Sequence, residues 1–345
     1  MAHVEALDRA SAPAALPQPE PGLTPMAAIA RAEALIPLLR EGQAEADERG
    51  HYAPAVHEAL LAGGLYRLVQ PRMFGGYEFS WTDFLRVVTT IARGHPSSGW
   101  CYCLGTSHAH LLGSHWPEQA QRELFGPDGD FRSPHRAAPS GSFTPVDGGY
   151  IVSGTWSYSS GIPYATHFCG GTMIPNAEGK MRPANFFVSR DKVTMLSDWG
   201  GDAALGMQGS GSNSVKLEEV FVPHHHVAFG DVLFGQDFDW SRGTHGARLH
   251  GNPMYLGVVG GPYHLCFSAI MAGAARAALD EYEAIIGERK AYGGGGGKMA
   301  GDPDVLRHVG EIMTLIECAE AYATLGEMCG VFRAVFGEYR EPVAV

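Results

Sequence analysis

Two glycine-punctuated stretches decide the fold of this 345-residue chain: GGYIVSGTWSYSSG at 148–161 and LGMQGSGSNSVKLEEVFVP at 205–223. Both have the composition and alternation of β-strands, whereas the sequence on either side of them has helical periodicity. In the first stretch, Trp156 precedes a run of four hydroxyl-bearing residues that Gly161 closes. Hydroxyls and backbone N–H groups can bond the heteroatoms of a flat polar ring, and glycine lets the backbone approach it. The alternative interpretation is an ordinary hairpin with a serine-rich turn.

The elements expected along the chain fall into three blocks. Helical spacing, proline at first turns and glycine at ends predict an N-terminal block of helices. Short β-branched runs separated by turns predict an antiparallel barrel or sandwich in the middle. Long apolar periodicity then predicts two helices joined by a short glycine loop, which indicates an antiparallel pair. The expected helices are 25–48, 53–63, 81–93, 97–112, 117–126, 257–290 and 302–337.

Composition excludes several function classes. The net charge is −12, which argues against nucleic acid or an anionic membrane surface as the main partner. There is no run of 18 apolar residues to span a membrane, and the N-terminus lacks the pattern of a secretory signal. Six cysteines are scattered among apolar residues with no CxxC pair. They are expected to be reduced thiols in a cytoplasmic protein.

Two further segments, EALLAGGLYRLVQPRMFGGYEFSW (58–81) and IARGHPSSGWCYCLGTSHAHLLGSHWPEQAQRELFG (91–126), extend the pattern. Together with the β-rich stretches, they resemble the acyl-CoA dehydrogenase superfamily. The resemblance is closer to its monooxygenase branch, the oxygenase components of two-component flavin-dependent monooxygenases. It spans roughly residues 25–340.

The resemblance implies an α+β, acyl-CoA dehydrogenase-like fold. Its parts would be an N-terminal helical domain, a middle antiparallel β-barrel or sandwich, and a C-terminal helical bundle. That bundle is expected to be incomplete, since the chain carries two of the family's four helices. The expected boundaries are a disordered tail at 1–24, the N-terminal domain at 25–130, the β-domain at 131–245 and the C-terminal domain at 246–345.

The activity implied by the resemblance is hydroxylation of an aromatic or polyketide-like small molecule. Reduced FMN or FAD would react with O2 through a C4a-hydroperoxide. A separate reductase would supply the reduced flavin, and the chain has no GxGxxG sequence after a strand for binding NAD(P)H itself. Relatives of this kind also imply a homotetramer, and the wide apolar faces of helices 257–290 and 302–337 point the same way.

Candidate site residues in the first half of the chain come from the same resemblance. Trp100 and His108 are eight apart and lie roughly on one helix face. By resemblance they line the flavin and substrate pocket, and a neutral His108 could deprotonate a phenol. Ser133 would place a hydroxyl near the substrate. For His108, a structural role is the alternative.

The remaining candidates are expected to bind flavin. By resemblance, Ser159 bonds the flavin N5 region, Trp156 flanks the ring, and Ser160 lies beside them. Ser212 belongs to a glycine-serine turn that is either a flavin contact or a simple hairpin. Arg289 is expected to reach the flavin phosphate of a neighbouring subunit, or else to be a surface residue at a helix end.

No metal site is expected. His224-His225-His226 resembles a metal-binding run, but three adjacent histidines rarely converge on one ion. Two other functions remain open. An acyl-CoA dehydrogenase would need a carboxylate base, and the helical glutamates Glu281, Glu283 and Glu288 lie toward the polar end of their helix. A flavin-free scaffold is the third possibility.

Overall fold

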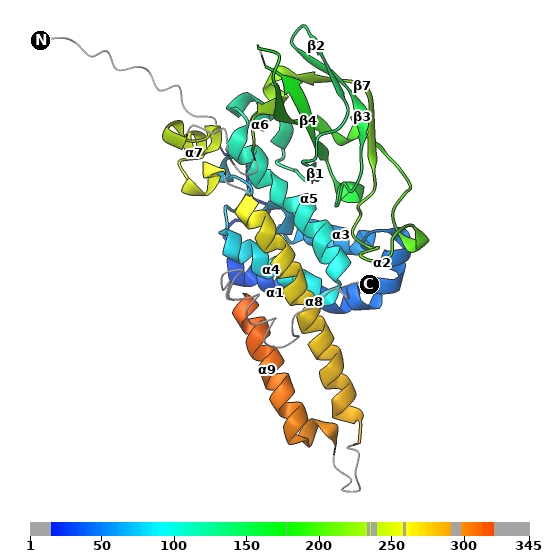
Figure 1. Ribbon diagram of the computed structural model, residues 1–345. Coiled ribbons are helices and arrows are strands. Elements are labelled where there is room, and N and C mark those ends of the chain that lie inside the picture. Colours follow the sequence, from blue (N-terminus) through cyan, green and yellow to red (C-terminus); the bar gives the residue numbers. More distant parts are fainter. Residues whose placement is uncertain are drawn as a thin grey trace, which may run out of the picture.

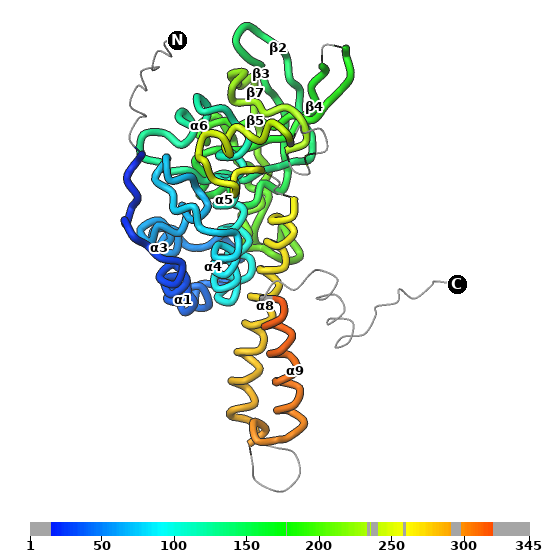
Figure 2. Tube along the Cα trace, turned by 90° about the vertical axis from the view of Figure 1, so that its left-hand side faces the viewer, coloured from blue at the N-terminus to red at the C-terminus, as the bar shows by residue number. Residues whose placement is uncertain are grey.

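The computed structural model describes residues 15–176, 178–232, 235, 240–257, 260–290 and 298–320. Helices of the N-terminal part lie beneath two β-sheets, and a pair of long helices extends away from both (Figures 1 and 2). The mixed helix-and-sheet class expected from the sequence is confirmed. Within the described residues, no helix combines the length and apolar character that crossing a membrane requires.

Six helices form the N-terminal part: α1 (Pro25–Glu41), α2 (Gln43–Arg49), α3 (Pro54–Ala62), α4 (Trp81–Gly94), α5 (Pro96–His115) and α6 (Glu118–Phe125). Thr24 caps α1 and Ser80 caps α4 by accepting a backbone N–H bond. The single helix expected at 25–48 is interrupted at Gly42, which caps α1. The assignment of 15–24 to a disordered tail also differs from the structure. Leu23 is buried and the Leu16 N–H bonds to the carbonyl of Met73.

In the described part of the chain, eight strands form two open four-stranded sheets and close no barrel. The first sheet has the order β1 (His135–Arg136), β4 (His167–Pro175), β5 (Met181–Ser189), β8 (Val227–Phe229). The second has the order β2 (Ser142–Val146), β3 (Gly149–Trp156), β7 (Val215–Pro223), β6 (Thr194–Met195). Aromatic side chains from both sheets share one core, in which Trp156 meets Phe168 and Phe186. All pairings are antiparallel, as expected, except that β1 is parallel to β4.

The long helix α8 (Gly260–Glu288) packs across α4 and then pairs with α9 (Pro303–Glu320) (Figure 1). A Cβ on Gly273 would lie 2.5 Å from the carbonyl oxygen of Thr89, so glycine permits the close approach to α4. Asp280 accepts two bonds of 2.7 Å from Arg93 and pairs with Arg40 of α1. Leu279 and Ile286 pack against α9. The expected helix 302–337 is described only as far as residue 320.

Short elements join these blocks. The remaining helix is α7 (His245–His250), and the 3₁₀ turns are η1 (Leu65–Arg67), η2 (Arg72–Phe74), η3 (Ile162–Tyr164), η4 (Arg190–Lys192), η5 (Gly201–Ala203), η6 (His224–His226), η7 (Trp240–Arg242), η8 (Pro253–Leu256) and η9 (Met299–Gly301). Of these, η6 directly follows β7.

Candidate active site

A cavity of about 460 Å³ lies where α5, the sheets and α8 meet. Its lining combines aromatic and apolar side chains with three serines, one histidine and one arginine. The residues are Trp100, Leu104, His135, Arg136, Tyr158, Ser160, Trp199, Met207, Ser210, Ser212, Phe267, Ile270 and Met271. A mostly apolar pocket with a few convergent polar groups is typical of a small-molecule site.

The loop after β3 brings hydroxyls to this cavity. Gly161 has a φ of +94°, and a Cβ there would lie 2.8 Å from the carbonyl of Cys101, so only glycine lets the loop pack on α5. Ser160 and Ser212 hydroxyls lie 2.7 Å apart, and the Ser212 hydroxyl lies 2.7 Å from that of Ser210. The cavity wall thus carries a connected chain of three hydroxyls from two separate loops.

Aromatic side chains form the flat walls. Trp100 of α5 packs on Phe267 of α8, with ring centroids 4.6 Å apart. Tyr158 meets Trp199 edge to face, at 5.7 Å. Tyr158 holds a φ of 59°, a conformation that is uncommon for a residue with a side chain and often marks a functional loop. The indole N–H of Trp199 is buried and has no hydrogen-bond partner among the described residues.

Two lining residues, His135 and Arg136, come from β1 and were not among the sequence candidates. The Nε2–H of His135 donates to Asn185 Oδ1 at 2.8 Å, which leaves the lone pair of the neutral ring on Nδ1. Burial, more than the neighbouring Arg136 charge, lowers the pKa of His135 to about 4 despite the bond to Asn185. Arg136 forms no ion pair with any described residue. A neutral imidazole therefore lies beside an uncompensated positive charge.

No protein-family model matches the chain. Curated proteins do: it is 31% identical over 294 residues to the flavin-dependent monooxygenase oxygenase subunit HsaA of Rhodococcus jostii, covering 84% of this chain and 73% of that one. This chain belongs to the flavin-dependent monooxygenase oxygenase subunits. The FADH2-dependent resorcinol hydroxylase oxygenase component of a Rhizobium species is 28% identical over 88% of this chain and 73% of its own length.

Solved structures show the same fold for this oxygenase subunit. The 3-HSA hydroxylase from Rhodococcus sp. RHA1 has a TM-score of 0.75 at 28% identity, covering 90% of this chain and 78% of that one. XiaF from a Streptomyces species, solved with FADH2 and glycerol, has a TM-score of 0.74 at 20% identity, covering 90% and 77%. The acyl-CoA dehydrogenase alternative is not supported, because the named relatives are monooxygenases.

The cavity of the oxygenase subunit fits a flavin. Its aromatic walls suit a planar ring, and the chain of serine hydroxyls can bond ring heteroatoms. Three sequence candidates, Trp100, Ser160 and Ser212, line it. Ser159 is adjacent but fully buried, and its hydroxyl donates to the carbonyl of Trp156 at 3.2 Å.

His108 and Ser133 lie behind His135 rather than in the cavity wall. The Nδ1–H of His108 lies 2.6 Å from the Leu104 carbonyl and 2.7 Å from the Ser133 carbonyl, and both accept. Its ring meets the His135 ring edge to face at 5.4 Å. Burial lowers the pKa of His108 to about 3, and the nearby His135 adds to that effect. The Ser133 hydroxyl donates to the Pro134 carbonyl at 2.9 Å.

Trp156 and Arg289 lie away from the cavity. Trp156 is buried in the core between the sheets, where its indole N–H donates to the Gly171 carbonyl at 2.9 Å. Arg289 is exposed just beyond the end of α8. It follows the cavity-lining Phe267 by 22 residues, a helical rise of about 33 Å. Arg289 therefore cannot contact a flavin in the cavity of its own chain.

Proposed function

We propose that this protein uses reduced FMN or FAD and O2 to hydroxylate an aromatic small molecule that carries an ionisable hydroxyl. The observation that supports the substrate class is the His135–Arg136 pair at one side of a cavity with aromatic walls. An imidazole lone pair accepts a hydrogen bond from a phenol, and a guanidinium stabilises a phenolate. Named relatives include the resorcinol hydroxylase and a p-hydroxyphenylacetate 3-hydroxylase, whose substrates are phenols.

The protein groups have separate roles in this proposal. When bound, the reduced flavin supplies the electrons that activate O2. The chain's own residues hold the ring between Trp100 and the loop carrying Ser160, bond its polar edge and exclude water with the apolar face of α8. A separate reductase delivers the flavin, and the protein works in the cytoplasm, where its buried thiols remain reduced.

Reduced flavin is expected to bind more tightly than oxidised flavin. Reduced flavin is anionic near neutral pH, and Arg136 offers a positive charge that no described carboxylate neutralises. Anaerobic titration with reduced and oxidised FMN and FAD measures the difference. In Arg136→Gln, the affinity for the reduced form should fall more than that for the oxidised form. Equal binding of both forms by the wild-type protein would contradict the proposal.

Ser159→Ala is expected to raise the yield of hydrogen peroxide at the expense of hydroxylated product. Ser159 is fully buried beside the cavity loop, and its bond to Trp156 holds that loop in place. Loss of one buried hydrogen bond costs about 1 kcal/mol, or roughly a fivefold change in partitioning. Peroxide and product are measured in single turnovers, with Ser160→Ala as the matched variant. An effect of Ser160→Ala alone would transfer the role to Ser160.

A homotetramer is also proposed. The domain boundaries proposed for each chain are 25–130, 131–245 and 246–345. Exposed apolar side chains recur along α8, namely Phe267, Met271, Tyr282 and Ile285, each at least 38% exposed. A second copy covering them would also close the cavity, since Phe267 and Met271 line it. Arg289 would then contact a flavin phosphate in the neighbouring subunit. Light scattering should give four chains, and a stable soluble monomer would contradict this assembly.

A further inference from the structure

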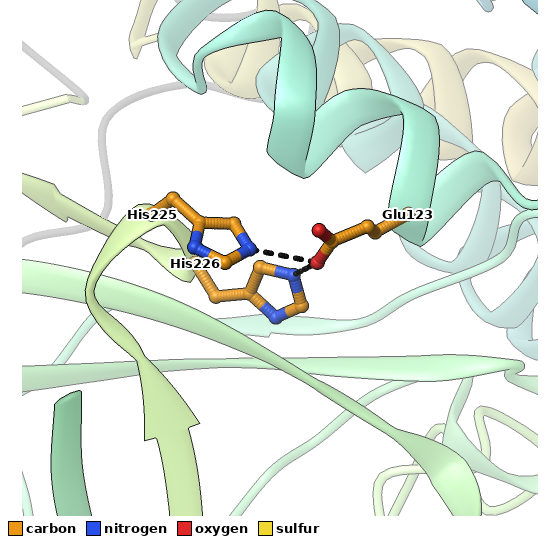
Figure 3. Close-up of side chains that lie close together, drawn as sticks. All are labelled: Glu123, His225 and His226. Carbon is orange, nitrogen blue, oxygen red and sulfur yellow. Dashed lines mark hydrogen bonds and ion pairs between the residues drawn. The ribbon is translucent and has the colours of Figure 1, made fainter. Parts of the chain in front are cut away.

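Glu123, His225 and His226 form a side-chain cluster outside the active-site cavity (Figure 3). Glu123 comes from α6, and the two histidines come from η6. His225 Nε2 lies 2.7 Å from Glu123 Oε2, and His226 Nε2 lies 2.8 Å from the same oxygen. The ligand atoms of all three side chains lie within 4.8 Å of one another.

Two of the three adjacent histidines converge on Glu123, and the third does not, in agreement with the expectation that three in a row rarely meet at one point. Residues of a 3₁₀ turn project about 120° apart, so three in a row cannot face one point. His224 instead faces β3, where its ring meets Tyr150 at 5.0 Å. His225 and His226 have side chains long enough to reach the same oxygen from adjacent positions.

Bonds outside the cluster hold it in place. The indole N–H of Trp116 donates to the backbone carbonyl of His226 at 2.8 Å, which fixes η6 to the corner between α5 and α6. Gln119 Nε2 donates to Glu123 Oε1 at 3.1 Å, so the carboxylate presents Oε2 to the two imidazoles. Such outer contacts orient metal ligands and reduce the cost of ordering them on binding.

We propose that Glu123, His225 and His226 bind Zn²⁺ and thereby fasten α6 to η6. Two imidazole nitrogens and one carboxylate oxygen are a common zinc ligand set, with water in the fourth position. Tetrahedral coordination at ordinary Zn–N and Zn–O distances places ligand atoms about 3.3 Å apart. The rings would therefore move away from Glu123 by roughly half an ångström, with each Nε2 proton relocated to Nδ1 or released.

Access and charge also suit the ion. The side chain of Glu123 is 45% exposed and that of His225 is 27% exposed, so Zn²⁺ can enter from solvent. The carboxylate supplies negative charge, while the nearby Lys192, whose charge acts on His226, opposes a cation. The competing explanation is a hydrogen-bonded pairing of imidazole and carboxylate without metal, and a Zn²⁺ titration separates the two.

The test uses the full chain without a histidine tag, stripped with a chelator and titrated with ZnCl2 by calorimetry. Wild-type protein should bind one Zn²⁺ per chain. His225→Ala, His226→Ala and Glu123→Gln should each weaken binding by about 100-fold or more. His224→Ala is the matched control, because it shortens the same histidine run without touching the cluster, and should retain full affinity. Co²⁺ in place of Zn²⁺ should give the absorption of a tetrahedral site.

Thermal unfolding tests the fastening role. Zn²⁺ should raise Tm in the wild type and in His224→Ala, and leave Tm unchanged in the three ligand variants. Glu123→Gln preserves the side-chain shape, so this variant decides the outcome if a histidine variant fails to fold. Equal Zn²⁺ affinity in wild type and Glu123→Gln, or equal loss in His224→Ala, would overturn the site. Zn²⁺ binding by the wild type with no rise in Tm would overturn the fastening role.

Discussion

His135→Ala is expected to lower the hydroxylated product formed per reduced flavin oxidised by about 100-fold. His135 lines the cavity, and its bond to Asn185 directs the free lone pair to Nδ1. Its pKa of about 4 keeps the ring neutral at working pH, so it can accept the hydroxyl proton of a phenol. That low pKa also makes it a weak base, which places the effect at the lower end of the range of about 10²–10⁴ that is usual for acid–base groups.

The oxidation of the flavin by O2 should be nearly unchanged in the same variant. Single turnovers with reduced flavin, a phenolic substrate and O2 yield both quantities, as product formed and as flavin reoxidation rate. Because both nearby rings have low pKa values, about 3 for His108 and about 4 for His135, neither should titrate between about pH 6 and about pH 9. An imidazole-like inflection in product yield over that range would contradict this assignment.

His108→Ala tests which histidine acts on the substrate. The geometry assigns this role to His135, whereas the resemblance assigned it to His108. His108 packs on His135 and bonds only backbone carbonyls of the described residues. Its removal should reduce product through displacement of His135, and therefore by less than His135→Ala does. His224→Ala, an exposed histidine elsewhere, controls for loss of any imidazole. A large loss in His108→Ala with a normal yield in His135→Ala would return the substrate role to His108.

Sequence patterns predicted most of the described helices because proline or a capping hydroxyl marks several starts, as at α1, α3 and α4. The break at Gly42 and the short helix α7 were not predicted. The alternation within β3 also predicts the position of Trp156, although the resemblance placed that residue beside the flavin ring. Tyr150, Val152 and Trp156 share the buried face, so the strand period alone places Trp156 in the core between the sheets. The shift in register between Val152 and Gly154 does not change this, since Trp156 remains paired with Val215 of β7.

His135 and Arg136 could not be found by the same means. The strand β1 contains only these two residues, too few for any periodicity, and its pairing with β4 is parallel and non-local. The available signal was a histidine and an arginine directly after Ser133-Pro134, a segment already singled out for Ser133. The convergence of His225 and His226 on Glu123 likewise depends on contact between elements about 100 residues apart in the chain, which local sequence does not encode.

Mild acid is expected to unfold this protein. His108, His110, His115 and His135 are buried, and burial is the largest cause that lowers their pKa values, to about 3 for His108 and about 4 for the other three. In the unfolded chain they regain a pKa of about 6.5. Between these values the unfolded state binds more protons than the native state, so the free energy of unfolding falls as pH drops below about 6.5.

The expected loss of unfolding free energy in acid is large compared with the total stability of the protein. Each histidine contributes up to about 1.4 kcal/mol per pH unit, or about 5–6 kcal/mol per pH unit for four acting together. A domain is stable by only about 5–15 kcal/mol, so the native state should be lost before about pH 4. Urea unfolding followed by tryptophan fluorescence at about pH 7.5 and about pH 5.5 measures the slope.

His110→Gln tests whether the buried histidines cause the pH dependence of the free energy of unfolding. The Nε2–H of His110 donates to the Met254 carbonyl at 2.7 Å, and a glutamine amide can make the same bond without titrating. The variant should therefore lose about 1.4 kcal/mol per pH unit of the dependence below about pH 6.5, even if its stability at neutral pH changes. His224→Ala, which removes an exposed histidine, should keep the wild-type slope. Equal slopes in His110→Gln and wild type would show that the acid sensitivity arises from other groups.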